Sequence, residues 1–299
     1  MTIEPRDLYE LRSAVPELGR PVLIQALDGF VDAGGARQLA RGHLLAAGDS
    51  QVLATFDTDL LYDYRARRPT MLFVEDHWES YEPPSLELHL LHDDAGTPYL
   101  LLAGPEPDVM WERFVAAVLE LVEQFGVRLT VGLNAIPMAV PHTRPVGVIA
   151  HSSRRELIAG HEPWVGSVQV PGSAGALLEH RLAERGHDAV GYAVHVPHYV
   201  AQSAYPAAAV QLISCVAQVS GLMVSVEALT EGADEARRLI DEQVASNIEV
   251  AEVVHALESQ YDAFVAGRGL LADGSRLPTG DELGAELERF LAEQRRRDT

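Results

Sequence analysis

The apolar run at residues 22–27 constrains the fold more than any other stretch of the chain. It stops abruptly at Asp28-Gly29 and is followed by helix-forming residues over 33–47. A run with so little polar interruption is typical of a strand buried on both faces of a sheet. Asp32 is placed to cap the helix, because its carboxylate can accept the unpaired N–H groups of the first turn. This unit predicts an open α/β sheet with Asp28 and Gly29 at its carboxyl edge, where such sheets bind ligands.

Apolar segments and helical patterns alternate along most of the remaining chain. The predicted strands are 51–56, 98–103, 128–133, 146–150 and 188–196. The predicted helices are 110–125, 176–185 and 206–220. This alternation is the pattern of a parallel or mixed sheet covered by helices on both faces.

Residues 86–103 carry the pattern of a β-hairpin. The segment 86–92 begins with period-two alternation, 93–96 reads as a turn, and apolar residues return at 98–103. Such a hairpin pairs either as a ribbon added to the domain or with one arm as a core strand.

The composition changes at residue 225, where a helical apolar stripe begins and few helix breakers follow. The stripe predicts one long helix or two helices joined near Gly232, then a linker at 267–280 and a final helix capped by Asp281. We therefore divide the chain into a core at 1–224 and a helical extension at 225–299. The many carboxylates of the extension are typical of a solvated helix face. Alternatively, the apolar stripe docks the extension over the ligand crevice as a lid.

Composition excludes several classes of function. The chain of 299 residues has a formal net charge of −21, which argues against nucleic-acid or anionic-membrane binding, because phosphate contacts need clustered Lys and Arg. The single cysteine, Cys215, forms no intrachain disulfide and fits a reducing cytoplasm. The first residues lack the apolar segment of a signal peptide, and no apolar run reaches the ~20 residues that span a bilayer.

Polar residues and glycines follow several predicted strands or begin helices. We list as candidate site residues Asp28, Gly29, Gly34, Asn134, His142, Arg144, Ser173, His195, His198 and Tyr199. Because parallel strands bring such loops to one edge, the set predicts a shared ligand crevice. Its carboxylate, amide, guanidinium, hydroxyl and imidazole groups could serve acid–base hydrolysis or binding.

Several of these residues also have simple structural interpretations. Asp28 before a glycine is often an Asx turn, and Ser173 suits a helix cap, because the G-x-S-x-G nucleophile pattern is not matched. His195 in an apolar strand is more often a core histidine. The loop that carries His142 and Arg144 contains three prolines, which marks either a functional loop or simple loop shaping. We predict no metal and no cofactor, since neither a metal-ligand spacing nor a phosphate-binding glycine motif is present.

Three segments together resemble a known family. PVLIQALDGFVDAGGARQLA, GLNAIPMAVPHTRP and PGSAGALLEHRLAERGHDAVGYAVHVPHYVAQSAYPAAAVQLI are similar to the PAC2 (proteasome assembly chaperone 2-like) family in its actinobacterial form. The resemblance covers roughly residues 15–222 and, more loosely, the helical tail. It implies a three-layer α/β/α core with a mixed, mainly parallel sheet, similar to purine nucleoside phosphorylases.

The resemblance also implies accessory elements. In relatives a β-hairpin insertion serves oligomerisation, commonly as a trimer, and a helical C-terminal region covers a ligand pocket. By position, 86–103 would be that hairpin and 225–290 that cover. The family name comes from eukaryotic proteins that help to assemble the proteasome α-ring, and the bacterial members provide no catalytic residue to transfer.

Two functions from different classes follow. The first is an oligomeric binding or assembly scaffold whose partners include proteasome subunits. The second is a hydrolase or phosphorylase with a pocket around Asp28, Asn134, His142, Arg144 and His198. Only Arg144 and the helix starts at Gly34 and Ser173 could cradle a phosphate in the second case.

Overall fold

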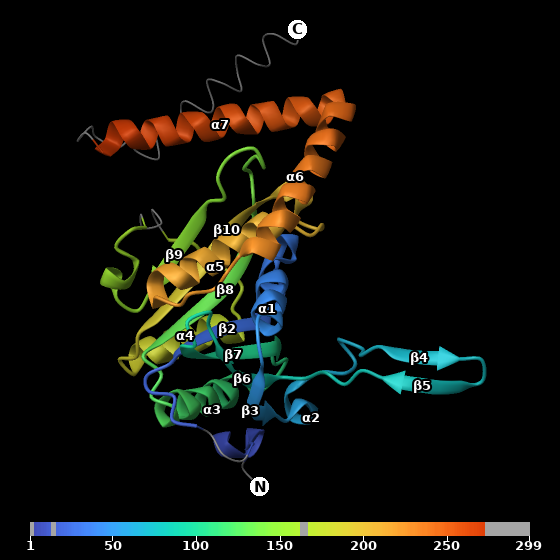
Figure 1. Ribbon diagram of the computed structural model, residues 1–299, viewed down its shortest axis with the longest axis vertical. Helices are drawn as coiled ribbons and strands as arrows, with labels where there is room; N and C mark the ends of the chain where they lie inside the picture. Colours follow the sequence, from blue (N-terminus) through green and yellow to red (C-terminus); the bar gives the residue numbers. More distant parts are fainter. Residues whose placement is uncertain (1–2, 13–15, 162–166, 273–299) are drawn as a thin grey trace. The chain divides into compact units, whose positions relative to one another are not determined.

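The computed structural model describes residues 3–12, 16–161 and 167–272. An eight-stranded mixed sheet forms the centre, in the order β1-β3-β6-β7-β2-β8-β10-β9 (Figure 1). Its strands are β1 (Tyr9–Leu11), β2 (Val22–Asp28), β3 (Gln51–Phe56), β6 (Glu87–His92), β7 (Pro98–Pro105), β8 (Leu129–Met138), β9 (Val148–Ser152) and β10 (Ala189–Pro197). The four neighbours β7, β2, β8 and β10 are mutually parallel, and the outer strands pair antiparallel. The predicted mixed α/β fold is confirmed.

Helices cover both faces of this sheet. The helices of the described residues are α1 (Ala36–Ala46), α2 (Thr58–Leu61), α3 (Trp111–Gln124), α4 (Ala174–Glu184), α5 (Pro206–Ser220), α6 (Glu227–Ser246) and α7 (Ile248–Ala272); of these, α1 and α5 cover one face and α3 and α4 the other. The buried residues of α1 and α5 join one hydrophobic core, and those of α3 and α4 join a second core on the other face. The result is a three-layer α/β/α arrangement.

Strand β2 shows why the apolar run at 22–27 is so informative. Val22, Ile24 and Ala26 belong to the core under α1 and α5, whereas Leu23 and Leu27 belong to the core under α3 and α4. A strand with helices on both faces has no solvated side, so both of its alternating sets must be largely apolar. The predicted strand, buried on both faces, is confirmed.

The turn after β2 satisfies the start of α1. One short 3-10 turn, η2 (Ala33–Gly35), lies between Asp32 and the helix. The Asp32 carboxylate accepts the backbone N–H groups of Arg37 at 2.9 Å and Gln38 at 3.0 Å. The predicted capping role of Asp32 is confirmed, with the helix beginning three residues later than expected.

The hairpin at 86–103 is real but is not an insertion. β6 and β7 pair antiparallel, and they continue the main sheet because β7 also pairs with β2 and β6 with β3. The strands β4 (Met71–Val74) and β5 (His77–Tyr81) form a separate ribbon. This ribbon stands away from the main sheet in Figure 1. Our placement of the insertion at 86–103 is therefore wrong. Both arms of the hairpin at 86–103 are apolar enough to be buried. The short strands β4 and β5, by contrast, show little periodic alternation of apolar and polar residues.

The helical extension divides between two compact units. The predicted division lies at residue 224; α6 belongs to the first compact unit, which ends at Ser246, and α7 belongs to the second. Leu229 of α6 belongs to the same core as α5. The helices are separated at Asn247 rather than near Gly232, and α7 continues to Ala272, into the predicted linker. The rest of that linker and the predicted final helix at Asp281 lie outside the described residues.

Within the described ranges, no helix combines the length and the hydropathy needed to span a bilayer.

Candidate functional site

A row of polar and glycine residues crosses four strands in register. Gln25 of β2 lies opposite Gly132 of β8, which lies opposite Gly191 of β10, which lies opposite His151 of β9. The two glycines leave the sheet surface bare. A Cβ at Gly191 would lie 1.9 Å from His151 Cε1 and 2.7 Å from Glu179 Oε2. The missing side chains therefore make room for the polar groups of neighbouring elements.

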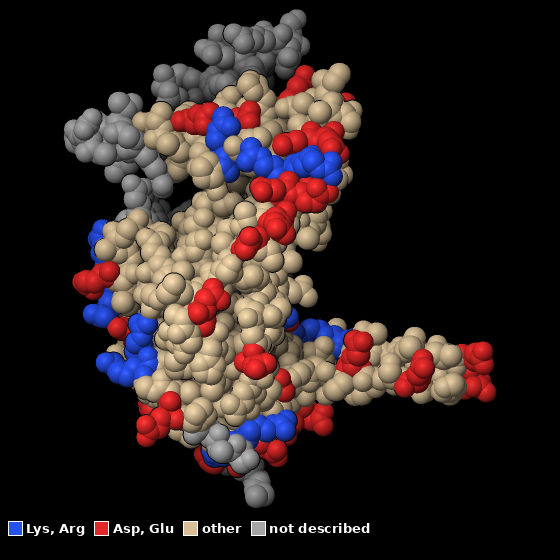
Figure 2. All heavy atoms as spheres, viewed as in Figure 1, with Lys and Arg blue, Asp and Glu red and all other residues tan. Residues whose placement is uncertain are grey.

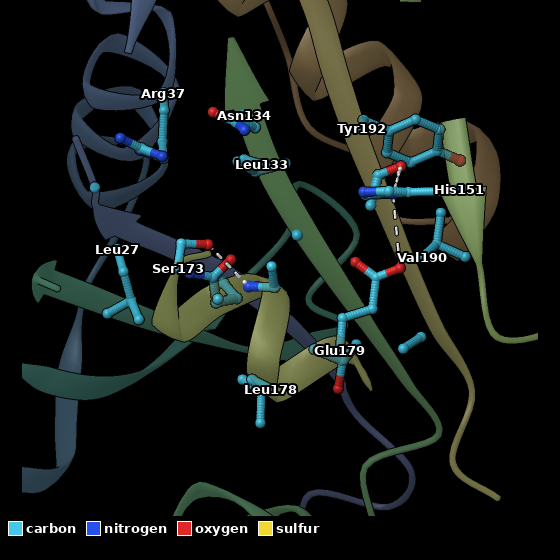
Figure 3. Close-up of a pocket in the computed structure, with 18 of the residues that line it drawn as sticks. Leu27, Arg37, Leu133, Asn134, His151, Ser173, Leu178, Glu179, Val190 and Tyr192 are labelled. Carbon is cyan, nitrogen blue, oxygen red and sulfur yellow. Dashed lines mark hydrogen bonds and ion pairs between the residues drawn. The ribbon is translucent and has the colours of Figure 1, made fainter. Parts of the chain in front are cut away.

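A cavity of about 90 Å³ lies between this row and α4 (Figure 3). Besides the row itself, its lining includes Gly29, Arg37, Glu106, Thr130, Asn134, Ser173 and Glu179. Figure 3 shows Glu179 reaching from α4 toward His151, with Arg37 and Asn134 on the other side of the cavity. The cavity thus has an imidazole–carboxylate end and a guanidinium–amide end.

Glu179 and His151 define the first end. His151 Nδ1 lies 3.0 Å from the Gly191 carbonyl oxygen, which can only accept, so this nitrogen carries a hydrogen. The neutral ring therefore offers Nε2 as an acceptor. The Glu179 carboxylate lies 3.6 Å from His151 Nδ1, and its side chain is 23% exposed. Burial raises the pKa of Glu179 to about 7, so this carboxylate changes its charge near neutral pH.

Arg37 and Glu106 define the second end. Arg37 is 6% exposed, and its Nη2 donates to the Val31 carbonyl oxygen at 3.1 Å. Its Nε has no hydrogen-bond partner among the described residues. Burial lowers the pKa of Arg37, and the charges of nearby carboxylates oppose that shift. Glu106 accepts the N–H of Ala174 at 2.5 Å, and burial raises the pKa of Glu106.

A second polar cluster lies around His142, which is 4% exposed. His142 Nε2 lies 2.9 Å from Asp241 Oδ1, and Nδ1 lies 2.7 Å from the Tyr199 hydroxyl. Because a carboxylate only accepts, Nε2 carries the hydrogen and Tyr199 donates to Nδ1. The same hydroxyl oxygen accepts the backbone N–H of His142 at 2.8 Å. This network joins the β8–β9 loop, the 3-10 turn η4 (His198–Val200) and α6, and we interpret it as structural.

Three of the ten predicted site residues meet at the cavity beneath α4. Gly29, Asn134 and Ser173 all line it. Ser173 is also the helix cap that the sequence suggested, because its Oγ accepts the N–H of Ala176 at 3.1 Å. His142 and Arg144 line a different hollow of about 400 Å³, together with residues of α6.

The other five predicted residues line neither of these two cavities. Asp28 forms an ion pair with Arg41, with 2.7 Å between Oδ1 and Nη1. Gly34 has a φ of 66° and packs so closely on Tyr205 that a Cβ there would lie 2.7 Å from the tyrosine Cβ. His195 lies against Gly147. The rings of His198 and Tyr199 meet edge to face, with their centroids 5.4 Å apart.

Sequence reasoning missed most of the polar lining of the cavity. The missed side chains are Gln25, Arg37, Glu106, Thr130, His151 and Glu179. Two signals were present: Gln25 is the one polar residue within 22–27, and Gly132 and Gly191 stand inside predicted strands. A glycine within a strand marks a close approach of other atoms. Among the residues that the structure describes, no group of three His, Cys, Asp or Glu could hold a metal ion.

This three-layer fold can be compared with known proteins. The model of the PAC2 family matches residues 26–244. A Mycobacterium tuberculosis protein of unknown function is 51% identical, with a TM-score of 0.86 over 89% of this chain and 92% of that one. A Corynebacterium glutamicum protein of unknown function is 41% identical, with a TM-score of 0.82 over 86% of this chain and 98% of that one.

A more distant solved structure carries a functional name. A proteasome-assembly chaperone homologue from Mycobacterium tuberculosis is 26% identical, with a TM-score of 0.71 over 78% of this chain and 99% of that one. A comparison with curated proteins found no match. The family match spans well over half of the chain, so this protein belongs to the PAC2 family, and the resemblance seen in the sequence is confirmed.

Proposed function

We propose that this protein is a homo-oligomeric assembly scaffold of the cytoplasm, a trimer, that assists the association of proteasome subunits and carries a small-ligand pocket beneath α4. Family membership supports the assembly role, since a relative of 26% identity is named a proteasome-assembly chaperone homologue. The single observation that carries the oligomeric part is the apolar surface of the β4–β5 ribbon.

Large apolar side chains are exposed on both strands of the ribbon. Phe73 is 53% exposed and Trp78 is 63% exposed, and their rings pack across the strands with centroids 5.0 Å apart. Met71, Leu72 and Tyr81 are also exposed. An isolated two-stranded ribbon is at best marginally stable in water. A contiguous cluster of exposed apolar side chains on such a ribbon marks an interaction surface.

The proposed occupant of this surface is a second copy of the chain. Residues 71–82 include Glu75, Asp76, Glu79 and Glu82 but no Lys or Arg. Figure 2 shows the ribbon as mainly uncharged, with acidic side chains along it. In a chain with a net charge of −21, contact between copies must come from apolar burial. The resemblance to the PAC2 family implies a β-hairpin that serves oligomerisation, and β4–β5 is a ribbon separate from the main sheet, which supports this choice.

The mass of the protein in solution tests the oligomeric part. We expect the wild type to scatter light as a multiple of 32.5 kDa and the double variant Phe73→Ser, Trp78→Ser to scatter as a monomer. Phe30→Ser is the matched control, because Phe30 is 65% exposed but lies outside the ribbon. A ribbon variant with unchanged mass would contradict this role of β4–β5.

The assembly role needs a separate experiment. Purified proteasome α and β subunits are mixed with and without the protein, and native gels follow the formation of rings and half-proteasomes. We expect faster or more complete assembly with the wild type and a smaller effect with the ribbon double variant. An unchanged time course with the wild type would refute the proteasome link.

An enzyme acting on a small molecule remains the second candidate, because of Glu179. A carboxyl group with a pKa of about 7 beside an imidazole is matched to acid–base catalysis near neutral pH. If the cavity is catalytic, a screen of nucleosides and small esters or amides should reveal a turnover that Glu179→Gln abolishes. Turnover that survives this substitution would place the chemistry elsewhere.

A further inference from the structure

We propose that the cavity beneath α4 binds a small neutral molecule of the amide class, one that presents a carbonyl oxygen and an N–H group. The inference rests on the ligand pocket of the proposed function but not on oligomerisation or on the proteasome. Its argument uses the unpaired polar atoms of the lining, their charges, their order along the cavity and its size.

Buried polar atoms of the lining lack protein partners. Arg37 Nε and Thr130 Oγ1 make no hydrogen bond within the described part of the chain, and their residues are only 6% and 4% exposed. Gln25 is also buried, with 7% of the residue exposed. Native proteins pair almost all such groups, because an unpaired buried donor or acceptor is costly. Arg37 Nε and Thr130 Oγ1 both have almost no accessible surface, so a bound molecule with both kinds of hydrogen-bonding group would pair with them after a small rotation of each side chain.

The charges of the lining favour a neutral ligand. Arg37 is the cation of the cavity, and it already experiences the charges of Asp28, Asp32 and Glu106. An anion would therefore meet an already compensated guanidinium at one end and the Glu179 carboxylate at the other. A cation would place a donor against the unpaired Arg37 Nε, which can itself only donate. A molecule without net charge avoids both penalties.

Arg37 and Asn134 lie at one end of the cavity and His151 and Glu179 at the other (Figure 3), with the Glu106 carboxylate near Arg37. Arg37 Nε and the Asn134 amide nitrogen are donors, because the Asn134 oxygen already accepts the N–H of Ala135 at 2.9 Å. Glu179 and His151 Nε2 supply acceptors at the opposite end. A carbonyl oxygen fits the first pair and an N–H group fits the second.

The floor of the cavity, which is formed by Gln25, and the size of the cavity both fit a ligand of the amide class. The Gln25 side chain carries one acceptor and two donors, the complement of an amide. The cavity of about 90 Å³ has room for several waters or for one small ligand. The Cβ that Gly175 lacks would lie 2.8 Å from Gln25 Nε2, so the first turn of α4 closes over the floor.

Three probes of similar size test the chemistry. 2-Pyrrolidone has both the carbonyl and the N–H group, cyclopentanone has only the carbonyl, and propionate is an anion. The full chain is labelled with 15N-glycine, and the amide signals of Gly132, Gly175 and Gly191 are followed during each titration. We expect saturable shifts with 2-pyrrolidone, at least tenfold weaker binding of cyclopentanone, and no binding of propionate.

Glu179→Gln tests the acceptor end, with Glu184→Gln on the same helix as the matched control. Glu184 lies outside the cavity lining and pairs with Arg181. We expect Glu179→Gln to weaken 2-pyrrolidone about tenfold at about pH 8, since a charged acceptor bonds more strongly than a neutral one, and Glu184→Gln to leave binding unchanged. Thr130→Val, an isosteric loss of one unpaired hydroxyl, should also weaken binding.

Binding of 2-pyrrolidone to the wild type should weaken by up to about tenfold from about pH 8 to about pH 6, because Glu179, with its pKa of about 7, gains a proton. The other ionisable groups of the lining are His151 from β9, Arg37 from α1, Glu106 after β7 and Tyr192 from β10. Protonation of His151 would remove its acceptor and act in the same direction.

Three results would overturn the inference: no shift of the three glycine signals with any probe, equal binding of 2-pyrrolidone and cyclopentanone, or preferred binding of propionate. The first would leave the cavity to water alone, and the last would make it an anion site. The ribbon double variant should bind 2-pyrrolidone as the wild type does. Failure of the assembly proposal and failure of this one are therefore separable.

Discussion

Loss of the Tyr199 hydroxyl should destabilise the protein well beyond the loss of one surface hydrogen bond. This hydroxyl contacts two atoms of the buried His142: the backbone N–H at 2.8 Å and Nδ1 at 2.7 Å. Tyr199→Phe keeps the ring but leaves both atoms unpaired. Each unpaired buried group costs about 1–3 kcal/mol, and because the two share one partner we expect a total of about 3 kcal/mol.

Equilibrium urea unfolding, followed by circular dichroism, measures this change in the free energy of unfolding. A loss of about 3 kcal/mol would lower Tm by about 5 °C in a chain of this size. Tyr64→Phe is the matched control, because the Tyr64 hydroxyl donates to Asp59 at 2.7 Å on the surface. We expect less than about 0.5 kcal/mol for that change.

The reasoning would be refuted if the two tyrosine variants unfolded within about 0.5 kcal/mol of each other. Hydrogen exchange gives a second readout, because His142 also holds Asp241 of α6 at 2.9 Å. Backbone amides of α6 near Asp241 should exchange faster in Tyr199→Phe. Protection equal to that of the wild type would show that this network does not anchor the helix.

Two further predictions concern the cavity beneath α4. The pKa of Glu179 is raised by burial from 4.5 to about 7, so the folded state holds this proton more tightly and loses stability as the pH rises through that range. Glu179→Gln should therefore stabilise the protein at about pH 8 by at most about 3 kcal/mol but hardly at about pH 5, and an equal gain at both values would contradict the assignment. Gly191→Ala should cost about 1–3 kcal/mol by overpacking His151, whereas Gly42→Ala, with open space around it in α1, should gain up to about 1 kcal/mol in the same urea measurement.

The strand β2 and the start of α1 were readable from the sequence, because the signals that define them are local. An apolar run of six residues reports burial on both faces, and Asp32 caps a turn only a few residues away. The family resemblance rested on similarly contiguous segments. The β4–β5 ribbon escaped notice, since its strands are four and five residues long and their apolar side chains are exposed rather than buried.

By itself, the sequence determined the sheet-forming runs, the helices that cover them and the family of the protein, because each depends on neighbours along the chain. Tertiary structure alone decided that β6 and β7 continue the central sheet, that α6 packs with the core, and that Gln25, Gly132, Gly191 and His151 fall into one row. The register between strands distant in sequence sets that row, and a shift of one residue would turn these side chains to the opposite face.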